Sequence, residues 1–326
     1  MLSNPKSSAI CWLAEIDSSM RPLVGGKGAN LGQLLKAGFL VPNGFVVTTT
    51  TFRQVMEFNN MSSFLNGMHQ KLDPVNHTSF EREAQATRDL ISGAQIPNDL
   101  LSLLQTAFDS LGSPLVAVRS SATMEDSSTA SFAGQQDTYL NIQNHEEFIR
   151  ALLNCWASLY EPRSIAYRFE KGLQELSIEM GVVVQTMINP DISGVVFTLD
   201  PITGNTETLT VEAIYGLGEP LVSGEITPDL YIIDKASGTI FQQIVSEQIW
   251  MLKANDTGNV AEGKSVQLPV TPSDQGLPKL NQAQISELTQ TAISIHNYYG
   301  RPQDIEWAIC DNVLYILQTR PITTMP

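Results

Sequence analysis

The sequence predicts a protein of the α+β class, built as one large domain or as two lobes. An apolar run at 115–122, a strongly β-branched run at 180–187 and a further run at 193–198 are typical of strands. Amphipathic helical patterns lie between and after them, and the clearest covers residues 282–299. Asn189-Pro190 breaks the chain between two of the strands, so we expect two lobes to hinge there.

Composition is that of an ordinary soluble globular protein, with 42% hydrophobic residues and a mean hydropathy of −0.04. The first dozen residues lack the basic and apolar regions of a signal peptide, and no apolar run is long enough to cross a membrane. Cys11, Cys155 and Cys310 lie far apart, which excludes a zinc ribbon and fits a reducing cytoplasm. The four histidines show no metal-ligand spacing. We therefore expect a cytoplasmic protein without a membrane anchor.

The formal net charge is −15 at pH 7. Because a nucleic-acid backbone requires a basic surface, this charge argues against DNA or RNA as a partner. A nucleotide is still compatible with it, since a few Lys and Arg residues suffice locally and Mg²⁺ masks part of the negative charge. The charge therefore disfavours nucleic acid and leaves a nucleotide possible as a ligand.

The first informative segment, residues 23–32, surrounds Lys27 with glycines and leads into a helical pattern at 30–37. Glycines let backbone N–H groups approach a phosphate closely, and Lys27 would supply positive charge. The glycine spacing is not that of a Walker A loop. The alternative is a glycine turn with an exposed lysine, and this segment alone does not decide between them.

Arg119 marks the second informative segment. It lies near the end of the predicted core strand 115–122, where a guanidinium must find an anion. A loop of small residues that contains Gly134 follows, and it leads into a strand predicted from Thr138 to Ile142. Gly134 would permit close approach to a phosphate, and Thr138 would add a hydroxyl. The alternative is an Arg–carboxylate pair beside a flexible loop.

The remaining segments predict scaffold. We expect helices over most of residues 51–112, a helix capped by Asn144 in which Trp156 packs in the core, and a hairpin over residues 230–241. Residues 255–280 are rich in Gly, Pro, Ser and Asp, and predict an exposed excursion.

The last two strands carry polar groups at alternating positions. Asp304 and Glu306 share one face of the first strand, and Gln318 and Arg320 share one face of the second. Asp311-Asn312 between them predicts a hairpin turn.

The register of this hairpin decides its chemistry. A plain two-residue turn pairs Glu306 with Leu317 and sends Gln318 to the opposite face. A three-residue turn or a bulge pairs Glu306 with Gln318 and Asp304 with Arg320. Only the second register gathers oxygen ligands suited to Mg²⁺ beside a guanidinium suited to phosphate. The alternative is an edge hairpin with an exposed polar face.

Five segments taken together, in one order, resemble the nucleotide-binding domain of the phosphoenolpyruvate synthase and pyruvate phosphate dikinase family, with details most similar to its rifampin phosphotransferase branch. The resemblance covers essentially the whole chain. The five segments are residues 25–32, 118–122, 131–138, 216–219, and 304–307 together with 317–321.

The resemblance implies an ATP-grasp fold, with ATP in the cleft between an N-terminal lobe (residues 1–184) and a C-terminal lobe (residues 185–326). In the first lobe, Lys27 and Arg119 would hold phosphates, and Gly134 and Thr138 would lie in the loop that covers them. Such enzymes split ATP to AMP and pass its phosphoryl groups onward, so Lys27 and Arg119 would also be catalytic.

The same resemblance implies roles for residues of the second lobe. Gln185 would contact the adenine at the hinge, Glu306 and Gln318 would bind Mg²⁺, and Arg320 would clamp the transferring phosphate as a third catalytic residue. ATP and Mg²⁺ are therefore the expected ligands.

The family's enzymes also have a domain with a phosphorylated histidine and a separate acceptor domain. None of the four histidines here lies in the Gly-, Ser- or Thr-rich loop expected of that carrier. Such domains would act in cis in a longer protein or in trans. The hypotheses are a rifampin-directed phosphotransferase, phosphoenolpyruvate synthase itself, or a module that senses ATP without turning it over.

Overall fold

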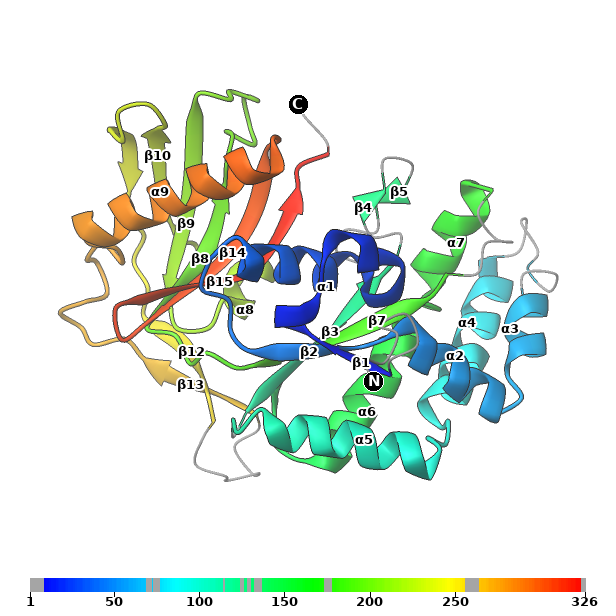
Figure 1. Ribbon diagram of the computed structural model, residues 1–326. Helices are drawn as coiled ribbons and strands as arrows, with labels where there is room; N and C mark the ends of the chain where they lie inside the picture. The colour runs from blue at the N-terminus through cyan, green and yellow to red at the C-terminus, as the bar shows by residue number, and fades with distance from the viewer. Residues whose placement is uncertain are drawn as a thin grey trace. The chain divides into compact units, whose positions relative to one another are not determined.

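The computed structural model describes residues 9–68, 72, 77–113, 115–123, 126–127, 130–131, 137–172, 178–255 and 264–323. The chain forms two compact units (Figure 1). Unit 1 comprises residues 1–33 and 43–187, and unit 2 comprises residues 34–42 and 188–326. Each unit contains one large antiparallel sheet with helices, which agrees with the predicted α+β class. The division of ATP-binding lobes after residue 184 stays a prediction.

Unit 1 is built on a five-stranded sheet in which every neighbouring pair is antiparallel. In spatial order its strands are β1 (Ile10–Trp12), β2 (Gly44–Val47), β7 (Met180–Thr186), β3 (Val116–Ala122) and β6 (Thr138–Ile142). A two-stranded ribbon adds β4 (Asp126–Ser127) and β5 (Ala130–Ser131), and two 3₁₀ turns are η2 (Leu13–Glu15) and η3 (Ser18–Met20). The strand predicted from Thr138 to Ile142 is confirmed.

The helices of unit 1 cover most of residues 51–112 and the segment after Asn144, as predicted, whereas the first of them begins earlier than predicted and the last was not predicted. They are α1 (Arg21–Lys36, whose last turn belongs to unit 2), α2 (Thr49–Phe58), α3 (Ser62–Gly67), α4 (His77–Ser92), α5 (Asn98–Ser110), α6 (His145–Ser158) and α7 (Pro162–Glu170). Asn144 caps α6, because its side chain accepts a hydrogen bond from the Glu147 amide at 3.0 Å.

One face of this sheet is buried in the main hydrophobic core. Val118 and Val184 point into it from neighbouring strands, and both are fully buried. Trp156 of α6 is also fully buried and packs edge-on against Phe52, with ring centroids 5.6 Å apart. The packing role predicted for Trp156 is confirmed. The opposite face of the sheet is the one on which the glycine-rich part of α1 lies.

Unit 2 is built on a six-stranded antiparallel sheet. In spatial order its strands are β11 (Ile240–Ile244), β10 (Asp229–Asp234), β9 (Thr208–Tyr215), β8 (Ile192–Phe197), β14 (Gln303–Cys310) and β15 (Val313–Pro321). The remaining elements are α8 (Glu219–Val222), β12 (Trp250–Ala254), β13 (Ser265–Pro269) and α9 (Gln282–Tyr299). The predicted hairpin at 230–241 is confirmed by β10 and β11.

Helix α9 lies across one face of this sheet (Figure 1). Leu288 and Ile295 of the helix and Ile305 of β14 are fully buried. An Asn281 capping box begins the helix and Gly300, in the left-handed conformation, ends it. Asp304 and Glu306 alternate with Ile305 along β14, so their side chains point to the other face of the sheet.

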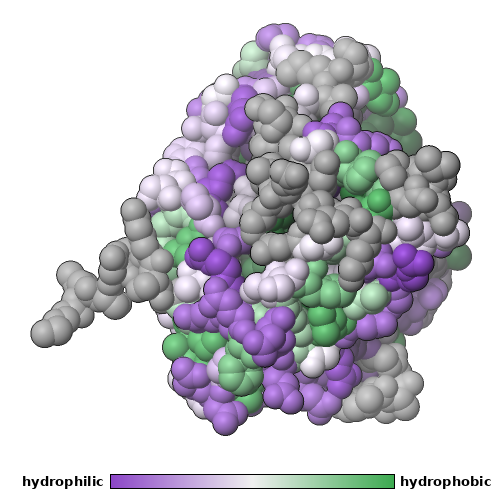
Figure 2. All heavy atoms as spheres, turned by 90° about the vertical axis from the view of Figure 1, so that its right-hand side faces the viewer, coloured by the Kyte–Doolittle hydropathy of each residue, from purple (hydrophilic) through white to green (hydrophobic). Residues whose placement is uncertain are grey.

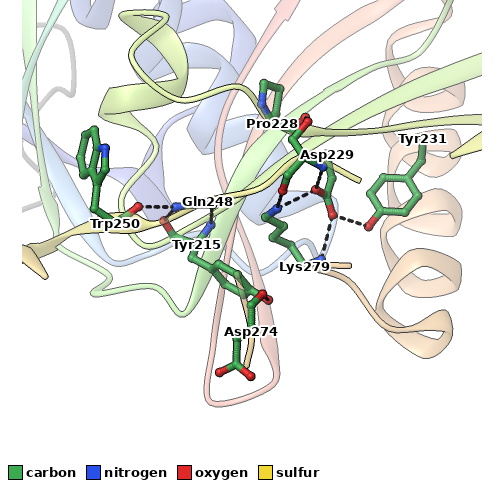
Figure 3. A network of polar contacts seen from close by, with 9 residues as sticks. Tyr215, Pro228, Asp229, Tyr231, Gln248, Trp250, Asp274 and Lys279 are labelled. Atoms are coloured by element: carbon green, nitrogen blue, oxygen red, sulfur yellow. Dashed lines mark hydrogen bonds and ion pairs between the residues drawn. The ribbon is translucent and has the colours of Figure 1, made fainter. Parts of the chain in front are cut away.

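The exposed excursion predicted for residues 255–280 is wrong in part. Within it, β13 pairs with β12, and Lys279 is fully buried at its end. The Lys279 Nζ lies 2.8 Å from Asp229 Oδ1, and Asp229 also accepts a hydrogen bond from the Tyr231 hydroxyl at 3.0 Å (Figure 3). Polar composition indicated exposure, but a charge can be buried when it finds an opposite charge and hydrogen bonds.

Hydrophilic side chains are interspersed with smaller hydrophobic areas over the described atoms of the face that Figure 2 draws. In the part of the chain that the structure describes, no helix combines the length and the apolar character that crossing a membrane requires.

Candidate functional site

The segment that carries Lys27 is shaped by a kink in α1. Gly25 interrupts the helix with φ of 74° and ψ of −179°, a conformation that favours glycine. A Cβ atom on Gly25 would lie 1.9 Å from the Ser121 carbonyl oxygen. The glycine is therefore required both by its backbone conformation and by its close approach to β3. Helical structure resumes after the kink and carries Lys27 in its first turn.

Ser121 fixes this segment onto the sheet. Its hydroxyl donates a hydrogen bond to the Val24 carbonyl at 2.8 Å and accepts one from the Gly28 amide at 3.1 Å. Gly28 in turn leaves room for Val46, because an added Cβ would lie 2.9 Å from that side chain. These hydrogen bonds give the serine two residues after Arg119 a structural role, which the sequence alone did not reveal.

Arg119, Thr138 and Gln185 lie on one face of the unit 1 sheet. Arg119 of β3 pairs with Thr138 of β6 on one side and with Val183 of β7 on the other. Gln185 is two residues beyond Val183 and is buried, with 3% of its surface exposed. Since paired residues and alternate residues of strands share a face, these three side chains lie on the face that Ser121 and the glycine segment occupy. Gly134 lies outside the described residues.

The C-terminal hairpin adopts the register that gathers the polar groups. Asp311 and Asn312, with φ of 51° and 60°, form a two-residue turn. Leu317 is then the extra residue of a β-bulge, so that Glu306 pairs with Gln318 and Asp304 with Arg320. The prediction that a bulge brings these groups to one face is confirmed.

Asp304 and Arg320 form an ion pair. The Nε and Nη2 atoms of Arg320 both lie 2.7 Å from Asp304 Oδ2, and the arginine side chain is 43% exposed. Burial raises the pKa of the Asp304 carboxyl, Arg320 opposes that rise, and the negative charge of Glu306 adds to it. Asp304 therefore orients a guanidinium that stays partly open to solvent.

Glu212 extends this row of acidic groups, and sequence analysis did not single it out. It pairs with Val195 of β8, and Val195 pairs with Glu306 on its other side. Burial, and then the charge of Asp304, raise the pKa of the Glu212 carboxyl. The only signal in the sequence was one charged residue within a β-branched strand. Glu212 and Glu306 come onto one face only because β8 pairs with β14, and β14 lies far from β8 and β9 along the chain.

The donor set on β14 and β15 fits Mg²⁺. Glu306 offers carboxylate oxygens and Gln318 an amide oxygen, which are ligands that a hard cation prefers. No group of three or more His, Cys, Asp or Glu residues among the described side chains is arranged to hold a metal. Mg²⁺ in nucleotide sites takes one or two protein ligands and completes its shell with phosphate oxygens and water, so Glu306 and Gln318 are a sufficient protein donor set.

The family model for the AMP/ATP-binding domain of pyruvate phosphate dikinase matches residues 21–326. The chain belongs to this family. With that membership, the expected ATP-grasp type of α+β fold is confirmed. The chain is also homologous to ATP-dependent dikinases and phosphotransferases.

Curated relatives of this ATP-binding family fall under two names. The chain is 39% identical over 321 residues to a probable phosphoenolpyruvate synthase from Archaeoglobus fulgidus, with 97% of this chain and 42% of the relative covered. It is also 39% identical over 315 residues to a rifampicin phosphotransferase from Streptomyces sp, with 96% and 36% covered. A probable phosphoenolpyruvate synthase from Methanothermobacter thermautotrophicus is 38% identical over 322 residues, with 97% and 46% covered. The chain thus spans less than half the length of these relatives.

Proposed function

We propose that this chain binds Mg·ATP and supplies the ATP-splitting part of a dikinase-type phosphotransferase. The observation that carries the proposal is the bulged register of β14 and β15, which sets Glu306 beside Gln318 and Asp304 beside Arg320. Glu306 and Gln318 would hold Mg²⁺, and Arg320 would clamp the phosphate that is transferred. Family membership supports ATP as the nucleotide.

The residues of unit 1 have complementary roles in this proposal. Lys27 and Arg119 hold phosphates, and Gly134 and Thr138 belong to the loop that covers them. Gln185 contacts the adenine. Phosphoryl transfer asks a protein mainly for positioning and for positive charge around the phosphates, and these residues supply both. The proposal takes residues of both units to act on the same nucleotide, as the two lobes of an ATP-grasp enzyme do.

For the whole enzyme, we take the acceptor to be rifampin, reached through a phosphorylated histidine on a further domain. Details such as residues 155–159 and 221–224 support the rifampin branch. Relatives named phosphoenolpyruvate synthase are as similar, so pyruvate is the second candidate acceptor. A module that senses ATP without turning it over is the third candidate.

Titration calorimetry with Mg·ATP tests the binding proposal. Lys27→Ala and Arg320→Ala should each weaken binding by tenfold or more, because charge-assisted hydrogen bonds to phosphate contribute about 1.5–3 kcal/mol each. Lys36→Ala on α1 and Arg301→Ala beside β14 are matched controls, since both side chains are exposed. Both controls should bind as the parent chain does.

Equal affinity of the parent chain, Lys27→Ala and Arg320→Ala for Mg·ATP would remove the basis of the assignment. A further check replaces Glu306 with Gln. This change should weaken binding in the presence of Mg²⁺ far more than in its absence, because it affects a metal ligand.

A further inference from the structure

Gln303, the first residue of β14, is a buried amide to which the proposed function gives no role. Only 1% of its surface is exposed, and its side chain lies on the face of the unit 2 sheet opposite to Glu306. Its Oε1 atom accepts a hydrogen bond from the Thr319 hydroxyl at 3.0 Å. Its Nε2 atom donates to the carbonyls of Arg301 and Pro302, both at 3.1 Å. Both polar atoms of the amide have partners, so its orientation is fixed.

Thr198 connects Gln303 to the end of β8 and to α9. The Gln303 amide donates to the Thr198 hydroxyl oxygen at 2.7 Å, and the Thr198 amide donates to the Gln303 carbonyl at 2.8 Å. A backbone amide can only donate, so the Thr198 hydroxyl proton stays available for His296 Nδ1 of α9, which lies 3.0 Å away. These side chains form one hydrogen-bonded group, the Gln303 cluster, whose members are His296, Thr198, Gln303 and Thr319.

The strand residues of the Gln303 cluster are next to residues of the proposed site. Gln303 immediately precedes Asp304, and Thr319 lies between Gln318 and Arg320. Side chains of a strand alternate between faces, so the cluster is on one face and the proposed ligand-binding groups are on the other. Thr319 also follows closely on the bulge of β15, where the ladder between the strands is disrupted. Its hydrogen bond to Gln303 therefore joins β15 to β14 just beyond the weakest point of their pairing.

We propose that Gln303 and Thr319 are positioning residues, whose buried hydrogen bond holds Gln318 and Arg320 in the geometry that Mg·ATP binding requires. This inference rests on the proposed function, because it takes Gln318 to bind Mg²⁺ and Arg320 to clamp a phosphate. Neither positioning residue contacts the nucleotide. Metal coordination and charge-assisted hydrogen bonds both depend on geometry, so a shift of β15 weakens both at once.

Titration calorimetry with Mg·ATP tests the inference on the intact chain. Thr319→Val keeps the side-chain shape and removes the hydroxyl, and it should weaken binding about tenfold, because β15 is then no longer held to Gln303. Thr319→Ser keeps the hydroxyl and should bind nearly as the parent chain does. The matched control is Thr289→Val. Thr289 is a buried threonine of α9 whose hydroxyl has no hydrogen-bond partner among the described residues, so this variant should bind as the parent does.

Arg320→Ala separates positioning from a general weakening of the sheet. In a chain that carries Arg320→Ala, adding Thr319→Val should weaken binding by at most about threefold, because one of the two groups that it misplaces is already absent. Thr198→Val removes the hydroxyl that binds the Gln303 amide, and it should act in the same direction in both backgrounds. Circular dichroism at the titration temperature verifies that each variant is folded.

The positioning role fails on its own if Thr319→Val and Thr198→Val bind as the parent does while Arg320→Ala binds weakly. In that case the proposed ATP binding stands. An equal loss with and without Arg320 would indicate a general effect on the sheet. Thr319→Ser as weak as Thr319→Val would show that side-chain volume matters and the hydroxyl does not. Absence of Mg·ATP binding to the parent chain would overturn the proposed function and this inference together.

Discussion

At the scale of single residues, the site collects carboxylates whose ionised forms are disfavoured. Burial raises the pKa of both Asp304 and Glu212, and each is raised further by a neighbouring carboxylate. Arg320 compensates part of the Asp304 charge, whereas among the described residues no basic group lowers the raised pKa of Glu212. Active sites are where such uncompensated charge is found, because a ligand or metal compensates it on binding. In the protein without a ligand, ionising these carboxyl groups therefore lowers the free energy of unfolding.

Because the ionised Glu212 carboxylate costs stability, Glu212→Gln should change the melting temperature in a pH-dependent way. A carboxyl whose pKa is raised in the folded state binds its proton more tightly there, so stability falls as pH rises from the ordinary pKa through the raised one. Glutamine does not titrate. Glu212→Gln should therefore melt close to the parent at pH 5 and about 1 °C higher at pH 8, a small effect because the carboxyl is partly exposed. Differential scanning fluorimetry without nucleotide measures it. A difference in melting temperature that does not grow with pH would contradict the prediction.

At the scale of elements, a strap formed by residues 246–255 and 264–280 depends on one buried ion pair. Besides Asp229, the Lys279 Nζ donates to the Ser246 carbonyl, and the Ser246 amide donates to Asp229 Oδ1 at 2.9 Å. Gln248 connects the strap to the end of β9, accepting from the Tyr215 amide at 2.9 Å and donating to its carbonyl at 3.0 Å (Figure 3). The strap therefore holds the strand end that leads into the glycine turn at 216–218.

Lys279→Met should destabilise the protein by about 3–5 kcal/mol, because it leaves the Asp229 charge buried without its partner. Adding Asp229→Asn to Lys279→Met should recover part of that loss, since the remaining amide is uncharged. Urea unfolding followed by circular dichroism measures both, with Lys36→Met, an exposed lysine of α1, as the control. A double variant no more stable than Lys279→Met would show that the ion pair is not the source of the effect.

The elements were largely predictable from the sequence, whereas their long-range pairing was not. Helix 282–299 and strand 138–142 were predicted at the observed residues, because local periodicity and caps determine them. The bulge at Leu317 was one of two alternatives, and only the pairing of β14 with β8 and β15 selects it. Glu212 and Lys279 were missed because the charged groups that act on them, Asp304 and Asp229, lie more than 45 residues away in sequence, where local patterns carry no information.

At the scale of the whole molecule, each unit holds residues to which the proposed function gives a role at the phosphates. Unit 1 fixes a lysine-bearing helix start to its sheet through Ser121, beside Arg119. Unit 2 uses a bulge to set an amide and a carboxylate next to a guanidinium that is oriented by Asp304. In a chain with a net charge of −15, the proposal takes these few basic groups to be the ones that meet the phosphates.

The chemistry of the whole chain predicts binding without turnover until a carrier histidine is supplied. His145 Nε2 lies 2.7 Å from Asp109 Oδ1, and His296 Nδ1 lies 3.0 Å from Thr198 Oγ1, so both described histidine side chains have structural partners. None of the four histidines lies in the Gly-, Ser- or Thr-rich loop expected of the family's carrier, so the 326-residue chain with Mg·ATP should form no AMP. Adding the histidine-bearing and acceptor domains of a relative in trans should produce AMP, measured by ion-exchange chromatography, and Arg320→Ala should abolish it while Arg301→Ala does not.

The acceptor then decides among the three candidate functions. Sustained AMP formation that requires rifampin would support the antibiotic phosphotransferase, and sustained formation that requires pyruvate would support phosphoenolpyruvate synthase. A chain that binds ATP but yields no AMP with either set of domains would favour the sensing module, because such a module binds ATP without turning it over. AMP formation by the chain alone would instead refute the need for a separate carrier, and His69 and His77 would be the first residues to replace. The same ATP site is compatible with each of these outcomes, since the nucleotide-binding residues do not contact the acceptor in the proposed mechanism.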